Sequence, residues 1–190
     1  MSYAIIRNEK YTKDQMIKLA PHNERMKKQY SNKNIDLSKT RQNYHIKKPI
    51  ENGYLKEYKR LVNENALNQG QVHSNSIFAC EVILTSDSAF FERMGKRENK
   101  RYFNECYEFF SNYNNLGKEN ILSAVVHLDE ETPHMHLVYI PVIDSKNKKG
   151  EKIRKISASE FWKGKGSYKT LQDNFYKYIK EKGFDLERGK

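Results

Sequence analysis

Cysteine is scarce in this 190-residue chain, and long hydrophobic runs are missing. No apolar run approaches the roughly 18 residues that a membrane-spanning helix needs, and the N-terminal segment lacks the apolar stretch of a secretory signal peptide. Cys80 and Cys106 both lie in apolar periodic segments, which favours buried thiols over a disulfide. We therefore expect a cytoplasmic protein that makes no membrane contact through this domain.

Acidic residues are outnumbered, with 24 Asp and Glu against 35 Lys and Arg, for a net charge of +11. Such a surplus favours an anionic partner, most often a nucleic acid and sometimes an anionic membrane surface. Aromatic residues are mainly Tyr (13) and Phe (9). Tyrosine beside lysine suits the stacking of bases with neutralisation of phosphates, although most such rings fill cores.

Apolar periodicity predicts an α+β fold, with a central antiparallel β-sheet of four or five strands and helices packed on one face. The pattern contains no repeat and no linker, so we expect residues 1–190 to form a single domain, the N-terminal part of a longer protein. Strands are predicted at 2–8, 43–46, 77–84, 121–126 and 137–143, and helices at 12–30, 54–67, 88–113, 157–161 and 168–182. A helix cap is expected at Ser86 or Ser88, and a basic loop at 145–155.

Residues 127–136 hold three of the six histidines of the chain. His134 and His136 are two apart in a predicted strand and therefore share a face. The short connection at 129–133 folds the two flanking strands into an antiparallel hairpin, which brings His127 to the same face. Three imidazoles on one face suit a metal with open coordination positions. Asp129 or Glu130 could add a fourth ligand or orient a ligand.

A second candidate lies upstream, at His22 and Arg25. Positions three apart on a helix face the same way, so the predicted 12–30 helix would present an imidazole and a guanidinium together. Arginine binds phosphate in a bidentate manner, and a neutral imidazole can act as a base or a nucleophile. The alternative is a surface histidine beside a solvated arginine.

Basic clusters supply the candidate DNA contacts. The basic loop at 145–155 follows directly from the second histidine strand, which favours it over the other clusters. Trp162 could stack a base or fill the core. The predicted DNA-binding residues are Lys146, Lys148, Lys149, Lys152, Arg154, Lys155 and Trp162.

Three motifs together resemble the MobV family of plasmid relaxases, also called Mob/Pre mobilisation and recombination proteins. They are His-Asn-Glu-Arg at 22–25, Asn-Tyr at 43–44 and His-x-Asp-Glu-x-x-Pro-His-x-His at 127–136. The resemblance implies an HUH-relaxase-like domain with His127, His134 and His136 as metal ligands. It also implies His22 as the nucleophile, Arg25 on the scissile phosphate and Glu130 as the acidic residue of the motif, with Tyr44 and Glu81 near the site. Many relatives carry an acidic residue where this chain has His45.

The implied activity is strand-specific nicking and closing at a plasmid origin of transfer, for conjugative mobilisation, through a 5′-phosphohistidine link. We expect Mn²⁺ rather than Mg²⁺, because imidazole is a poor ligand for Mg²⁺. The partner would be single-stranded or hairpin origin DNA, and a C-terminal region outside this chain is a candidate for dimerisation.

Three alternatives stay open. The first is a tyrosine-type HUH replication initiator or transposase, although no Tyr-x-x-x-Lys helix follows the histidine motif. The second is a non-catalytic DNA-binding module stabilised by a metal, although the thiolates usual in closed structural sites are lacking. The third is a metallohydrolase of small phosphate esters.

Overall fold

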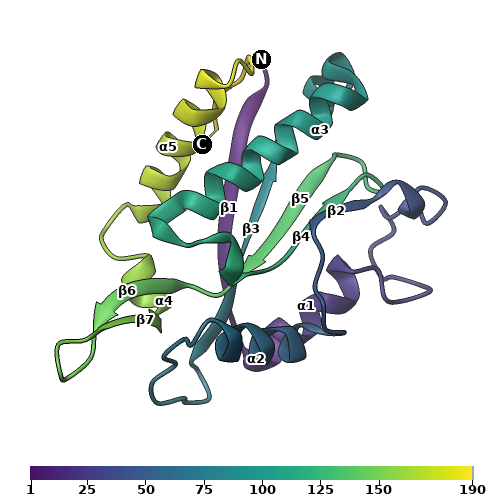
Figure 1. Ribbon diagram of the computed structural model, residues 1–190. Helices are drawn as coiled ribbons and strands as arrows, with labels where there is room; N and C mark the ends of the chain where they lie inside the picture. Colours follow the sequence, from purple (N-terminus) through teal and green to yellow (C-terminus); the bar gives the residue numbers. More distant parts are fainter. Residues whose placement is uncertain (190) are drawn as a thin grey trace.

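The computed structural model describes residues 1–189 and has a six-stranded sheet at its centre, in the order β2-β4-β5-β3-β1-β8 (Figure 1). All pairs are antiparallel except the short parallel pair of β8 with β1. The predicted α+β class with an antiparallel sheet is confirmed. The strands are β1 (Tyr3–Thr12), β2 (Tyr44–Lys47), β3 (Ile77–Thr85), β4 (Ile121–His127), β5 (His134–Tyr139) and β8 (Glu187–Arg188).

Helices cover both faces of this sheet, and not one face as predicted. On one face lie α3 (Ser88–Asn112) and α5 (Ser167–Glu181), and on the other α1 (Lys13–Asn23) and α2 (Tyr54–Glu64). The remaining elements are η1 (Thr40–Gln42), η2 (Tyr113–Asn115), η3 (Lys118–Asn120), α4 (Ala158–Phe161), and a separate hairpin of β6 (Val142–Lys146) and β7 (Lys152–Ile156). Among the described residues, no helix is long and apolar enough to cross a membrane.

Two apolar cores result from this arrangement, one on each side of the sheet. The larger core packs strand residues such as Val126 and Leu137 against aromatic residues of α3 and α5, including Phe110 and Phe175. The smaller core packs α1 and α2 against the other face. Leu122 lies in the smaller core, because the register shifts between Ile121 and Ser123. Cys80 and Cys106 are buried free thiols, as predicted.

Helix α1 is shorter than predicted and stops at the site. It begins with a capping box between Thr12 and Gln15 and ends at Asn23. Arg25 has a φ of 50°, in the left-handed region, so the chain leaves the helical path there. The helical spacing assumed for His22 and Arg25 is therefore wrong, and their proximity has another cause.

Helix α3 is capped by Asp87, whose side chain accepts a hydrogen bond from the backbone N–H of Phe90, and not by Ser86 or Ser88. Gly95 interrupts the helix with a φ of 73°, a conformation that glycine adopts without steric cost. The long part of the helix after Gly95 runs in its own direction and crosses in front of β1 and β3 (Figure 1).

Candidate active site

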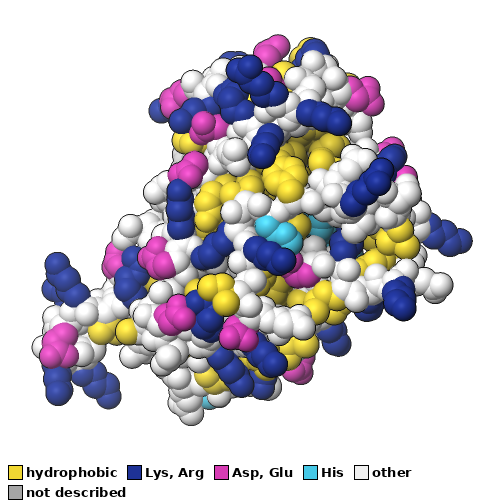
Figure 2. Space-filling model, turned by 45° about the vertical axis from the view of Figure 1, so that its right-hand side comes forward, with side chains coloured by type: hydrophobic (Ala, Val, Ile, Leu, Met, Phe, Trp, Pro, Cys, Tyr) yellow, Lys and Arg dark blue, Asp and Glu magenta, His cyan; other side chains and the backbone are white. Residues whose placement is uncertain are grey.

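The predicted histidine hairpin is present, and its three imidazoles converge. Strands β4 and β5 pair with His127 opposite His134 and Val125 opposite His136. The ring centroids of the three histidines are 4.8–5.3 Å apart. Figure 2 shows histidine side chains at the surface in a hollow with lysine and arginine side chains around it.

One nitrogen of each imidazole is held by an acceptor outside the cluster. His127 Nε2 lies 2.8 Å from the carbonyl oxygen of Asn23, and His134 Nδ1 lies 2.8 Å from that of Thr132. His136 Nδ1 lies 2.8 Å from Oε1 of Glu81. In neutral imidazoles these nitrogens carry the proton, so the lone pairs of the other three nitrogens point inward.

The inward nitrogens have the chemistry of metal ligands. His134 Nε2 and His136 Nε2 are 3.1 Å apart. In the tautomers that their outer hydrogen bonds favour, both nitrogens are acceptors, so neither can donate a hydrogen bond to the other. His127 Nδ1 is buried and has no hydrogen-bond partner within residues 1–189. A buried acceptor without a donor is costly, and a bound cation would satisfy it.

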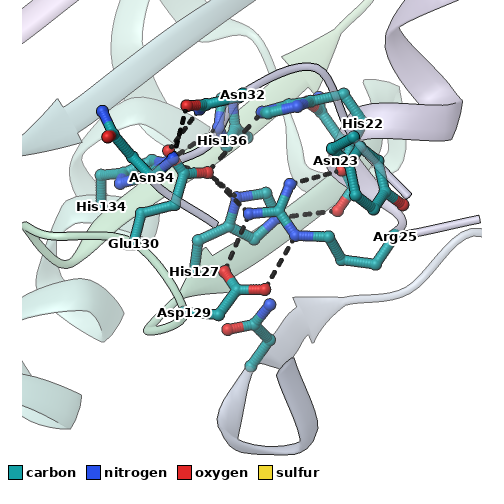
Figure 3. A network of polar contacts seen from close by, with 12 residues as sticks. His22, Asn23, Arg25, Asn32, Asn34, His127, Asp129, Glu130, His134 and His136 are labelled. Carbon is teal, nitrogen blue, oxygen red and sulfur yellow. Dashed lines mark hydrogen bonds and ion pairs between the residues drawn. The ribbon is translucent and has the colours of Figure 1, made fainter. Parts of the chain in front are cut away.

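His22 and Glu130 complete the cluster (Figure 3). Oε1 of Glu130 lies 3.7 Å from His127 Nδ1, 3.8 Å from His134 Nε2 and 3.9 Å from His22 Nε2. The His22 ring lies 5.5 Å from that of His136, centroid to centroid. Two groups of possible ligands have all donor atoms within 4.8 Å of one another, namely His22, His127 and His136, and His127, Glu130 and His134. The sequence did not indicate that His22 lies within ligand range.

The electrostatics favour neutral imidazoles around a charged carboxylate. Burial, and then the neighbouring histidines, lower the pKa of His22 and of His134 to about 4 in each case. His127 and Arg25 lower the pKa of Glu130 to about 2. At neutral pH His22 and His134 therefore present lone pairs beside the negative charge of Glu130, which is the chemistry that a divalent cation requires.

Arg25 anchors the turn of the hairpin, and its contact with the scissile phosphate stays a prediction. Its Nε and Nη2 donate to Asp129 at 2.9 and 2.8 Å, Nη2 donates to Glu130 at 2.6 Å, and Nη1 donates to the carbonyl of His22 at 2.8 Å. The Arg25 side chain is only 6% exposed. Asp129 also accepts from Thr40, so it is not available as the fourth ligand considered above.

Glu81 lies where the resemblance implied, in direct contact with a histidine of the cluster. Tyr44 does not contact the histidine cluster, because its side chain packs on the α3 side of the sheet. Its neighbour His45 faces the histidine side and contacts Glu24 at 2.5 Å. Many relatives carry an acidic residue at position 45. In this chain His45 stands there and pairs with the carboxylate of Glu24 beside the site.

The basic segment at 145–155 is a hairpin, β6 and β7, and lies far from the histidines. Strand β5 begins at His134 and leads away from the site, so six residues at about 3.3 Å each separate His136 from Val142. Arg154 binds Asp144, and Lys155 binds Glu160. The exposed lysines are Lys146, Lys148, Lys149 and Lys152.

Trp162 is a core residue, so its prediction as a base-stacking residue is wrong. Its side chain is buried, its Nε1 donates to the hydroxyl of Tyr139 at 3.1 Å, and its ring packs against Phe161 and Tyr113.

A cleft of ≈ 460 Å³ extends from the histidines over the half of the sheet that α1 and α2 leave open. Its walls include His22, His134 and His136, and its floor includes Ile83 and Arg7. Arg7 pairs with Ile83, and Ile83 with His136, so the three residues form one row across β1, β3 and β5. Arg7 is exposed and makes no ion pair within the described part of the chain. No sequence motif contains Arg7, and only its odd position in β1 places it on the histidine face.

Solved structures that are similar to this chain include relaxase domains. The chain matches the MobM relaxase domain bound to plasmid pMV158 oriT DNA, in an Mn-bound crystal structure, with a TM-score of 0.83, 31% identity and coverage of 99% of this chain and 90% of that one. It also matches the same domain bound to a 26-nucleotide oriT DNA, with a TM-score of 0.73, 28% identity and coverage of 99% and 91%. These matches confirm the relaxase type of fold.

A model of the family described as plasmid recombination enzyme (Mob_Pre) matches residues 1–190. A plasmid recombination enzyme of Lactiplantibacillus plantarum is 33% identical over 189 residues, which is 100% of this chain and 49% of that protein. A type 2 enzyme of Staphylococcus aureus is 35% identical over 190 residues, 100% of this chain and 42% of that protein. The chain belongs to the plasmid recombination enzyme family and spans less than half the length of these relatives.

Proposed function

We propose that residues 1–190 form one relaxase domain, a metal-dependent and strand-specific DNA nicking-closing transesterase that acts at a plasmid origin of transfer. One observation carries the proposal: the His22 side chain, 37% exposed, stands beside three imidazoles whose outer nitrogens are anchored. The proposal is further supported by the family and by the DNA and Mn in the MobM structures.

His127, His134 and His136 would hold the cation, with Glu130 within reach of it. Bound there, a divalent cation polarises the non-bridging oxygens of a phosphate and offsets charge in the transition state. We favour Mn²⁺, because this set of imidazole and carboxylate donors suits it better than Mg²⁺. Glu81 and Thr132 act as positioning groups, since each fixes the proton on the outer nitrogen of a histidine.

His22 is the proposed nucleophile. The lone pair of its unprotonated nitrogen attacks phosphorus, a P–N bond forms, and the bond from phosphorus to the 3′ oxygen breaks. The 3′ oxygen leaves with the bonding electrons and takes up a proton, while the phosphorylated ring releases its remaining N–H proton. The resulting 5′-phosphohistidine keeps its transfer potential, so attack by a 3′ hydroxyl reseals the strand.

Glu130 is the carboxylate that faces His22 and can orient its ring. Glu81 instead holds His136, because its Oε1 is engaged by His136 and Asn23. Arg25 acts indirectly, by holding Glu130 and the His22 carbonyl in place. The phosphates beside the scissile bond would lie on the open half of the sheet, within reach of Arg7.

The decisive experiment combines nicking with adduct mapping. The protein is incubated with Mn²⁺ and a supercoiled plasmid carrying its candidate transfer origin, and digested peptides are analysed by mass spectrometry for an attached nucleotide. We expect the adduct on His22. An adduct on a tyrosine would overturn the nucleophile assignment, and DNA binding with neither nick nor adduct would favour the non-catalytic module.

A pair of histidine variants tests the same assignment. We expect His22→Ala to abolish nicking while its affinity for DNA stays within about twofold, because the ring acts in the chemical step and not in general phosphate binding. His73→Ala removes an exposed histidine outside the site and serves as the matched control. Undiminished nicking by His22→Ala would contradict the proposal.

A further inference from the structure

A second cavity lies on the opposite side of the hairpin turn from the histidines. It has a volume of ≈ 460 Å³ and is lined by Tyr44, Lys96, Lys100 and Pro133, together with Gln42, Asn99, Phe103 and Leu128. This size lies within the range of roughly 300–1,000 Å³ that is typical of small-ligand sites. We call it the Tyr44 pocket.

The Tyr44 pocket adjoins the active site through the chain itself. Leu128 directly follows His127, and Pro133 directly precedes His134, so the pocket and the site share the turn at 129–132. A strand of DNA leaving the histidines over this turn would reach the pocket next. Figure 2 shows apolar side chains exposed beside the histidines, with basic side chains around them.

One stripe of α3 forms the basic wall of the pocket. Lys96, Asn99, Lys100 and Phe103 follow at helical spacing, so they point the same way. The break at Gly95 separates this segment from the first turns of the helix. Lys96 and Lys100 are exposed, and neither makes an ion pair within residues 1–189. Two unpaired ammonium groups at the rim of an apolar cavity complement an anion attached to a flat apolar group.

Tyr44 forms the aromatic wall. Its ring is half-buried on the α3 side of the sheet, and the Nζ of Lys100 lies 5.8 Å from the ring centre. Asn43, directly before it, accepts a hydrogen bond from the backbone N–H of Leu128 at 2.7 Å, which fixes β2 against the hairpin. The backbone that carries the ring is therefore anchored, which lowers the entropic cost of stacking.

We propose that the Tyr44 pocket binds an unstacked base of the DNA strand that occupies the active site, with the ring of Tyr44 against the base and Lys96 and Lys100 on the adjacent phosphates. The inference rests on the proposed function for the identity of the ligand as DNA. It adds a second anchoring point that would fix the position of the strand relative to His22.

Photocrosslinking of the unaltered protein tests the pocket directly. The probe is a fluorescein-labelled 20-nucleotide oligo(dT) carrying one 5-iododeoxyuridine, bound in EDTA so that no nicking occurs. Stacking tolerates any base, so the origin sequence is not needed. We expect irradiation to attach the probe to Tyr44. Crosslinks confined to residues outside the pocket would overturn the proposal.

Binding by matched variants gives the second readout. We expect Tyr44→Leu to weaken binding of the same oligo(dT) by about fivefold or more, and Tyr44→Phe, which keeps the ring, to stay within about twofold. A Tyr44→Leu variant with a normal melting temperature and unchanged affinity would contradict the pocket. If this variant does not fold, the crosslink on the unaltered protein decides.

The salt dependence of DNA binding tests Lys96 and Lys100 separately from Tyr44. Each lost phosphate contact reduces the slope of log affinity against log salt by about 0.7 for a single strand. We expect Lys96→Ala with Lys100→Ala to reduce it by about 1.4, and the exposed pair Lys177→Ala with Lys180→Ala on α5 to leave it unchanged. Nicking without a crosslink at Tyr44 would reject the pocket alone, and a crosslink without nicking would reject the proposed enzyme alone.

Discussion

Oε1 of Glu81 lies 2.8 Å from Nδ1 of His136, across the neighbouring strands β3 and β5. The same oxygen accepts a hydrogen bond from the side chain of Asn23 at 2.7 Å. Burial opposes ionisation of Glu81, but the hydrogen bond from His136 prevails and holds its pKa below the ordinary value. A charged carboxylate therefore fixes the proton on Nδ1 of His136 and leaves Nε2 free for a metal.

The first prediction concerns this contact. Glu81→Gln keeps the size of the side chain and removes its charge, so we expect the affinity for Mn²⁺ to fall about 10- to 100-fold, the usual cost of losing such a partner. Isothermal titration with Mn²⁺ measures the effect. Glu92→Gln, an exposed position on α3, is the matched control. An unchanged affinity for Mn²⁺ in Glu81→Gln would show that Glu81 does not support the metal site.

The histidine hairpin could be predicted because its determinants are local. Alternation with a period of two sets the face on which His134 and His136 lie, and a short polar turn sets the antiparallel return that adds His127. Glu81 came from the resemblance alone. No local pattern links it to His136, since the pairing of β3 with β5 joins residues 55 positions apart.

The wrong predictions have non-local causes. The environment of Arg25 depends on where α1 stops, which the apolar pattern placed seven residues too late, at 30 in place of Asn23. The face on which Tyr44 lies depends on the pairing of β2 with β4. The 145–155 segment shows that a residue following a site in the sequence can lie beyond the far end of the strand that carries the site.

The second prediction concerns the ion pair of Arg25 with Asp129, whose side chains are 6% and 0% exposed. Asp129→Asn leaves the buried guanidinium with half its counter-charge, so we expect the free energy of unfolding at neutral pH to fall by about 3 kcal/mol. Urea denaturation measures it. Asp185→Asn, at an exposed position, is the control.

The ion pair of Arg25 with Asp129 also makes the free energy of unfolding depend on pH. Although burial opposes it, the hydrogen bonds from Arg25 and Thr40 lower the pKa of Asp129 from 3.8. A lowered pKa gives stability that is present above 3.8 and is lost as the pH falls toward the folded value. The stability difference between the unaltered protein and Asp129→Asn should therefore narrow below that pH. A constant difference would contradict the ion pair as its source.

The third prediction concerns Trp162, which is 6% exposed. We expect Trp162→Ala to lower the free energy of unfolding by about 3–5 kcal/mol, because a large buried ring is replaced by a cavity. The DNA affinity of the folded fraction should stay unchanged, since the ring faces the core. Thermal denaturation and fluorescence anisotropy separate the two effects. A loss of affinity with normal stability would restore the base-stacking role.

The fourth prediction concerns Arg7, the unpaired cation in the row that runs through Ile83 to His136. Two strand spacings place its backbone about 10 Å from that of His136, close enough for its side chain to meet a phosphate adjoining the scissile one. We expect Arg7→Ala to reduce the salt slope of single-strand binding by about 0.7 and to slow nicking at subsaturating DNA. Lys59→Ala, an exposed cation on α2, removes the same charge elsewhere and should change neither. Equal effects of the two variants would mean that Arg7 contributes only through net charge, and the DNA path over the open half of the sheet would have to be abandoned.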